Sequence, residues 1–470
     1  MQVERCHKVE VAPEWGAWRR LDHTLGTERW RAVTCFSLFL TFLLCFAPGG
    51  MSPDTVWQYK EALDGVFYNW HPPIMVAVWR LLFFFQQGPL PMLCFQLLML
   101  FGACWLLSGL GVKKGEAQWY WLFLPLLPQV YCVTGMIWKD VEQAFAFFLA
   151  FALYARSVEE KSTARLLLAL LFTCYGLLVR HNSIFALFAP IFLLTFWHCK
   201  YKKFLAKTLL AIGILCGLLV FSSCVNKLLT AGDDRTPVWV QLFDEIGATS
   251  HVVGKNLFLP ELDLSKLPLE KIPPVQVGGS WPLHSYGNAK NATPETWYKN
   301  ILWIIRNYPL QYLQAKWNLF LHFSSFPFKY RSIWSFGIVT MNQNFVDVTT
   351  QRSLLRTILE YPIKLCHRWK VDGQYPLEIF FLPILWMPLG VVLVIATLRL
   401  QDAQGRRSIL LLVSSGLGYY FSWFLVCSTP DYRYILWPNL SIIAALVIWI
   451  HAAWKQRRNA TPGPHAAQDA

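Results

Sequence analysis

Charged residues are scarce in this chain. Asp, Glu, Lys and Arg together make up 15% of its 470 residues, whereas about 25% is usual in a soluble domain. Hydrophobic residues make up 55%, and the mean hydropathy is positive. A chain with so little charge has to place much of its apolar surface against lipid, which excludes a soluble globular enzyme.

The cysteines also lack any pattern of a disulfide framework or a metal site. None of the 12 forms a Cys-x-x-Cys pair, and most lie inside apolar runs, where Cys behaves as a small hydrophobic residue. A cleavable signal peptide is not expected either, because the first apolar run begins only near residue 32 and has the character of an anchor.

Long apolar runs, in contrast, are abundant. Runs near 20 residues predict membrane-spanning helices, and the expected fold is an all-α polytopic membrane protein with about ten of them. They lie at about 32–48, 90–110, 117–136, 141–156, 165–180, 183–198, 206–224, 377–398, 408–427 and 435–453. The shorter run Ile74–Phe85 contains Arg80 and predicts a juxtamembrane helix on the membrane surface.

The distribution of positive charge predicts the topology. The net charge of +14 is explained by the positive-inside rule, so no nucleic-acid partner is expected. Lys and Arg lie in alternate short loops, which places both termini in the cytoplasm. The expected location is a bacterial inner membrane, with an active site, if there is one, facing the periplasm or cell exterior. The expected units are a cytoplasmic arm (1–31), a seven-span module with the catalytic first outer loop (32–224), a large extracytoplasmic loop or cap (225–376), a three-span module (377–454) and a cytoplasmic tail (455–470).

The cap is predicted to be mainly α-helical. Its clearest element is a helix from Glu295 to Phe323, which has apolar residues at helical spacing and is expected to lie along the membrane face. Trp, Phe and Leu are too frequent in this loop for a disordered segment.

Ionisable side chains gather where the predicted spans meet the outer face. Such groups are costly at membrane depth and indicate a functional site. Together they predict a site for an anionic head group beside a carboxylate. Each residue also has a simpler explanation: helix capping for Asp54, an interfacial ion pair for Lys139 with Asp140, and snorkelling to lipid phosphate for Arg180. The remaining rim residues are Asp431 and Arg433.

Four segments resemble the GT-C superfamily of membrane glycosyltransferases, which use polyprenyl-phosphate sugars. Asp54 follows the first span, and Trp70-His71-Pro72-Pro73 leads into a surface helix ending at Gly88. Lys139-Asp140 follows the third span, and Asp431-Tyr432-Arg433-Tyr434 precedes the last one. The chain looks closest to bacterial relatives of protein mannosyltransferases and to the aminoarabinose transferase of lipid A; O-antigen-modifying glucosyltransferases belong to the same broad class. The resemblance covers about the first 200 residues and the last two spans.

The resemblance implies roles for these residues. Asp54 would be the catalytic base, and the donor phosphate would be bound by Lys139, Arg180 and Arg433. Supporting roles fall to Asp140, His71, Tyr432 and Tyr434, and the candidate sugar platforms, or else interface anchors, are Trp57, Trp70 and Trp138. Many relatives carry a second acid beside the first, whereas Thr55 follows Asp54 here. No metal ligand is therefore predicted, although a divalent cofactor stays open.

The expected activity is inverting transfer of a monosaccharide from a polyprenyl-phosphate donor to a cell-envelope glycan or glycolipid. Two alternatives remain open. A glycan polymerase or ligase would use a diphosphate-linked oligosaccharide on the same face. A lipid or glycolipid transporter would place charged or broken helices at mid-membrane and would often show inverted repeats.

Overall fold

The computed structural model describes residues 26–112, 117–200, 203–231, 238–262, 264–272, 293–324, 381–426 and 432–460. Throughout these ranges the chain forms helices and no strand; one isolated β-bridge joins Gly50 to Met136. Helices satisfy their backbone hydrogen bonds within one segment, as a chain surrounded by lipid requires. The predicted all-α class is confirmed. The predicted arm, cap and tail are described only in part.

Six helical segments are long and apolar enough to cross a membrane, which indicates a membrane protein. They are α2 (Glu28–Phe46), α5 (Leu90–Ser108), α7 (Lys139–Glu160), α10 (Phe204–Leu229), α16 (Ala403–Val426) and Arg433–Arg458, which includes α17 (Leu436–Ala460). These correspond to six of the ten predicted spans. Three further predicted spans are shorter helices of 17, 15 and 15 residues: α8 (Thr163–Val179), α9 (Ile184–His198) and α15 (Pro383–Thr397).

The remaining predicted span, 117–136, is not a single helix. The chain forms a 3-10 helix, η2 (Trp119–Leu126), and then the short helix α6 (Pro128–Thr134). Leu127 between them is extended, with ψ at 132°, because a residue before proline avoids the α conformation. The ten-span count is therefore not confirmed.

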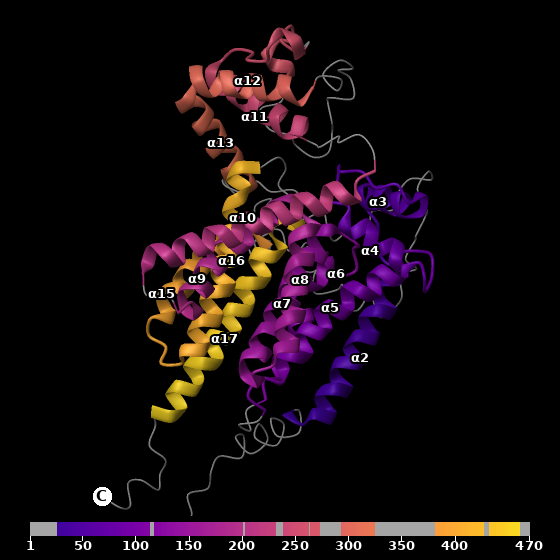
Figure 1. The fold of residues 1–470 in the computed structure, drawn as a ribbon, viewed down its shortest axis with the longest axis vertical. Coiled ribbons are helices and arrows are strands. Elements are labelled where there is room, and N and C mark those ends of the chain that lie inside the picture. Colours follow the sequence, from indigo (N-terminus) through magenta and orange to yellow (C-terminus); the bar gives the residue numbers. More distant parts are fainter. Residues whose placement is uncertain are drawn as a thin grey trace, which may run out of the picture.

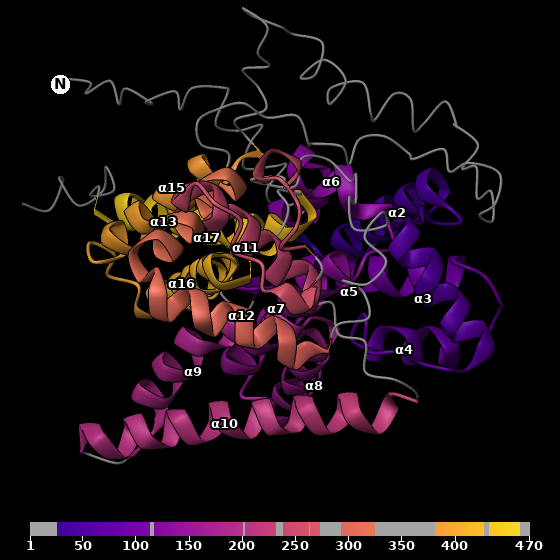
Figure 2. The same ribbon diagram turned by 90° about the horizontal axis from the view of Figure 1, so that it is seen from above.

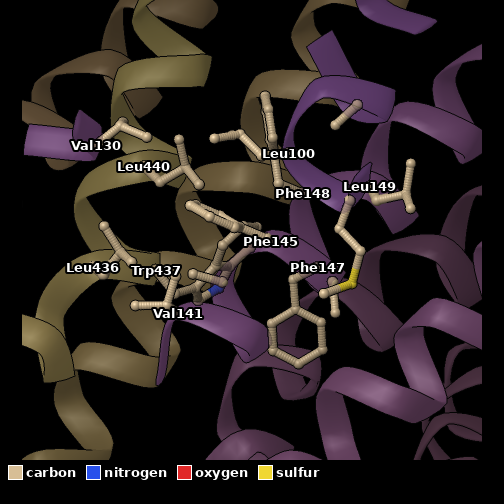
Figure 3. Packing of buried hydrophobic residues seen from close by; sticks show 14 of the residues in the cluster. Leu100, Val130, Val141, Phe145, Phe147, Phe148, Leu149, Leu436, Trp437 and Leu440 are labelled. Atoms are coloured by element: carbon tan, nitrogen blue, oxygen red, sulfur yellow. The ribbon is translucent and has the colours of Figure 1, made fainter. Parts of the chain in front are cut away.

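Helix α7 lies at the centre of the bundle, where it packs against α5, α8 and α17. Figure 3 shows its buried side chains facing the apolar side chains of α17. Phe145 and Phe148 are fully buried, and the rings of Phe147 and Trp437 lie 5.4 Å apart. This packing fixes the N-terminal end of α7, which carries two of the candidate site residues.

The cap stands at one end of the bundle (Figure 1). Its helices are α11 (Val238–Val253), α12 (Pro294–Asn307) and α13 (Pro309–Phe323). They share a small apolar core that includes Phe243, Leu262 and Trp297. The single helix predicted from Glu295 to Phe323 is two helices, because Pro309 begins a new one. Helix α13 contacts α16 and lies between α12 and the bundle (Figure 1).

Helix α10 has an unexpected direction. In both views it runs crosswise over the flank of the bundle, at a steep angle to α7, α16 and α17 (Figures 1 and 2). It contacts α9, α8 and α4 (Ile74–Leu82). Its buried residues are Ala211 and Leu215, so most of its apolar surface remains free to face lipid.

Candidate functional site

Asp54 lies in the first turn of α3 (Pro53–Asp64), a short helix outside the candidate spans. Ser52 is the N-cap of this helix, because its hydroxyl accepts a hydrogen bond from the backbone N–H of Thr55 (3.4 Å). Asp54 is therefore not the capping residue. Its side chain keeps 39% of its surface exposed, which leaves the carboxylate accessible to a substrate.

Hydrogen bonds join this first rim to the second. The hydroxyl of Thr55 donates to the carbonyl oxygen of Ile137 (2.6 Å). The backbone N–H of Gly50 donates to the carbonyl oxygen of Gly135 (2.8 Å), and the backbone N–H of Ile137 donates to the carbonyl oxygen of Gly50 (2.9 Å). Ile137 lies two residues before Lys139, so these bonds fix Asp54 relative to the N-terminus of α7. Thr55 therefore has a positioning contact here.

The second rim supplies Lys139 and Asp140, in the first turn of α7. The ammonium group of Lys139 lies 2.5 Å from Nδ1 of His71, which is buried just before α4. Burial, together with the charge of Lys139, holds the pKa of His71 well below its usual value. The ring is therefore neutral and accepts a hydrogen bond from Lys139.

Two arginines from distant parts of the sequence complete the cluster. Arg180, which follows α8, forms an ion pair with Asp140, whose side chain is only 1% exposed. Arg433, in the 3-10 helix η9 (Tyr432–Ile435), donates from Nη1 to Oδ2 of Asp54 (3.0 Å). Its Nε lies 4.0 Å from Oδ2 of Asp140. The structure thus brings all four predicted rims together.

Aromatic rings support both arginines. The guanidinium carbons of Arg180 and Arg433 lie 4.7 and 4.9 Å from the ring centre of Tyr434. Tyr434 in turn stacks on Trp423 of α16, with ring centres 4.7 Å apart. Arg433 also lies over Trp138, 5.4 Å from its centre. Flat guanidinium groups on aromatic faces are held without losing their hydrogen-bond donors.

Among the described residues, the cluster has more basic side chains than carboxylates. Three basic side chains (Lys139, Arg180, Arg433) face two carboxylates (Asp54, Asp140). Burial alone would raise the pKa of Asp54, but the nearby positive charges, Arg433 foremost, outweigh it and lower the pKa to about 2. Asp54 is ionised at neutral pH, and basic side chains outnumber carboxylates by one among the described residues of the cluster. An anion with a single charge would complete the set.

The aromatic residues predicted as sugar platforms differ from one another. Trp57 is 61% exposed, and the ammonium group of Lys60 lies 5.7 Å from its ring. Trp70 is half-buried. Trp138 is buried beneath Arg433 and presents no open face for a sugar, so the structure gives it the role of a support for the arginine. The side chain of Tyr432, like the whole of Asp431, lies outside the described residues.

Two neighbouring residues were not among the predicted site residues. His181 directly follows Arg180 and is exposed. Glu142 is fully buried below the rim and accepts a hydrogen bond from the hydroxyl of Tyr175 (3.0 Å). The polar run Arg180-His181-Asn182 between two apolar segments was the available signal for His181.

Replacing Thr55 with valine, which has the same shape but no hydroxyl, is expected to lower the free energy of unfolding by about 1–3 kcal/mol, because a buried carbonyl loses its donor. Thr55→Ser keeps the hydroxyl and is the matched control. Denaturation of both variants in detergent micelles measures the difference. A valine variant as stable as the serine variant would show that the bond to Ile137 does not hold the two rims together.

Across the described residues, no three side chains of His, Cys, Asp and Glu are grouped as the ligands of a metal ion would be. Metal use stays a matter of prediction. No protein-family model, curated protein or solved structure matches this chain.

Proposed function

We propose that this protein is a membrane glycosyltransferase that moves a monosaccharide from a polyprenyl-phosphate donor to a cell-envelope glycan or glycolipid. One observation carries the proposal: a partly exposed carboxylate, Asp54, lies among three basic side chains, which outnumber the carboxylates by one within the described residues. A polyprenyl-phosphate sugar is a phosphodiester with one negative charge, which would balance this excess. A diphosphate-linked donor carries two, so the cluster favours the monophosphate and disfavours a polymerase or ligase.

The proposed reaction is a single displacement. Asp54 accepts the proton of an acceptor hydroxyl, whose oxygen attacks the anomeric carbon from the side opposite the phosphate. The bond between that carbon and the phosphate oxygen breaks, and the lipid phosphate leaves with both electrons, so the configuration inverts. Lys139, Arg180 and Arg433 stabilise the charge that develops on the phosphate, since preorganised cations are most effective where charge appears in the transition state.

The test is sugar transfer in membrane vesicles, with radiolabelled polyprenyl-phosphate monosaccharides as donors and a glycolipid as acceptor. Asp54→Asn is expected to reduce transfer by about 10²–10⁴-fold, the usual contribution of a positioned general base. Asp64→Asn is the matched control, because Asp64 lies exposed at the other end of the same helix.

The outcomes separate the candidate functions. Transfer that survives in Asp54→Asn would keep the enzyme class and move the base to another carboxylate. Wild-type protein that ignores every monophosphate donor but extends a glycan from a diphosphate-linked oligosaccharide would be a polymerase or ligase. Movement of a glycolipid between leaflets without transfer would make it a transporter.

A further inference from the structure

We propose that Arg433 is a latch on Asp54: in the empty protein it holds the carboxylate in an ion pair, and the donor phosphate draws it away, so that Asp54 becomes an active base only when the donor is bound. The inference rests on the proposed function and concerns how the same site is switched on. It assigns Arg433 a second role besides binding phosphate.

The geometry of the empty site motivates the latch. Within the described ranges, the one ion pair of Asp54 is with Arg433, Nη1 to Oδ2, at 3.0 Å. Asp140, in contrast, has Arg180 as a close partner and Arg433 only at 4.0 Å. Departure of Arg433 would therefore free Asp54 while Asp140 keeps its charge compensated. The two carboxylates differ in this respect although they lie in the same cluster.

An ion-paired carboxylate is a poor proton acceptor. The guanidinium occupies an oxygen of Asp54 and stabilises its ionised form. Burial raises the pKa of Asp54, but the nearby positive charges, of which Arg433 is the foremost, outweigh it and lower the pKa to about 2. A base of that strength would rarely take a proton from a hydroxyl group, because catalytic bases work best with a pKa near the ambient pH. The empty site is thus arranged to bind an anion but not yet to catalyse transfer.

A phosphate group is a suitable competitor for Arg433. Two phosphate oxygens can accept two parallel hydrogen bonds from one guanidinium group. In the empty site, Arg433 has only one such bond to Asp54, from Nη1 to Oδ2. Arg433 also has support that does not depend on Asp54. Its Nη2 donates to the hydroxyl of Tyr434 (3.0 Å), and its guanidinium lies against the faces of Tyr434 and Trp138. A small shift of the Arg433 guanidinium across these rings would replace its contact with Asp54 by a contact with the donor phosphate.

The latch has a consequence that simple removal of a base does not have. Asp54 and the donor phosphate compete for Arg433, so neutralising Asp54 should strengthen phosphate binding while it abolishes transfer. Neutralising Asp54 also removes direct repulsion between two anions. Competition and repulsion are distinguished by measuring whether Asp54→Asn still raises phosphate affinity when Arg433 is absent.

The experiment measures binding of undecaprenyl phosphate, the leaving group of the proposed reaction, to the full-length protein in nanodiscs for wild type, Asp54→Asn, Arg433→Gln and the double variant. It is carried out at about pH 5, where a phosphate monoester has mainly one negative charge, as the donor does. Asp54→Asn is expected to bind about tenfold more tightly than wild type, within the usual 5–150-fold range of coupling between two sites. In the Arg433→Gln background, the same substitution is expected to change affinity by less than about threefold. Arg433→Lys, which keeps the charge without the planar fork, serves as a second probe of the same coupling.

Several results would overturn the latch. An equal gain from Asp54→Asn with and without Arg433 would show simple repulsion, and an unchanged or weaker affinity in Asp54→Asn would show no competition. If Asp54→Asn loses transfer but gains no affinity, the latch is wrong and the glycosyltransferase proposal stands. If wild-type protein neither binds undecaprenyl phosphate nor transfers sugar, both proposals fail. Asp64→Asn and unchanged melting temperatures control for folding.

Discussion

Replacing Lys316 with methionine is expected to lower the free energy of unfolding by about 3–5 kcal/mol, the usual result of breaking a buried ion pair from one side. Lys316 of α13 is 5% exposed and its partner, Glu245 of α11, is 3% exposed. Its ammonium group donates to Glu245 and to the carbonyl oxygen of Leu425, both at 2.7 Å. One side chain thus joins two cap helices to the outer end of α16.

The loss should come from the charge left behind. Without Lys316, Glu245 keeps the hydrogen bond from the hydroxyl of Tyr312 (2.7 Å) but loses the ion pair with the ammonium group. Adding Glu245→Gln to Lys316→Met is therefore expected to recover part of the stability. Chemical denaturation in micelles measures both variants, and Lys299→Met, at an exposed position of α12, is the control. Equal stability of the two methionine variants would mean that this ion pair does not fasten the cap.

The second large effect is expected from Arg180→Met, which should also lower the free energy of unfolding by about 3–5 kcal/mol. The reason is that Asp140, whose side chain is only 1% exposed, would lose its close partner. The variant should also bind lipid phosphate more weakly. Arg180 contacts the rings of Trp423 and Tyr434 (5.1 and 4.7 Å), so part of the loss is packing.

A double variant distinguishes charge from packing. If the lost charge dominates, Asp140→Asn should restore stability in the Arg180→Met background. If the aromatic contacts dominate, Asp140→Asn should make little difference, and Arg180→Lys should be almost as unstable as Arg180→Met because lysine cannot stack in the same way. Thermal unfolding in nanodiscs reports stability, and lipid-phosphate binding is measured on the same samples. Wild-type stability in Arg180→Met would contradict both explanations.

The cluster at the outer rim could be predicted from the sequence only as a set. Charged residues at the ends of apolar runs must lie near the membrane boundary, and Asp54, Lys139, Arg180 and Arg433 do lie together. Their pairing could not be predicted. Asp54 and Arg433 are 379 positions apart in the sequence. A contact between them depends on how the helices pack against one another, and residue spacing within one helix does not determine that packing.

The incorrect predictions have local causes. The apolar window at 117–136 averages over Pro125 and Pro128, which interrupt helical hydrogen bonding, and Pro309 divides the predicted cap helix in the same way. The direction of α10 has a different cause. A helix that is apolar on all sides has no preferred face, so its composition indicates a lipid environment without indicating how the helix lies in it.

The crosswise course of α10 brings its C-terminal end close to the loop that precedes the candidate site. Its 26 residues extend over about 39 Å at 1.5 Å per residue, so the helix borders lipid along a broad flank and not around a narrow perimeter. Just beyond its end, the backbone N–H of Ala231 donates to Phe67, in the loop that leads to His71 (3.0 Å). The loop that leads to His71, the partner of Lys139, is therefore anchored by a backbone hydrogen bond to the chain just beyond the most lipid-accessible of the described long apolar helices.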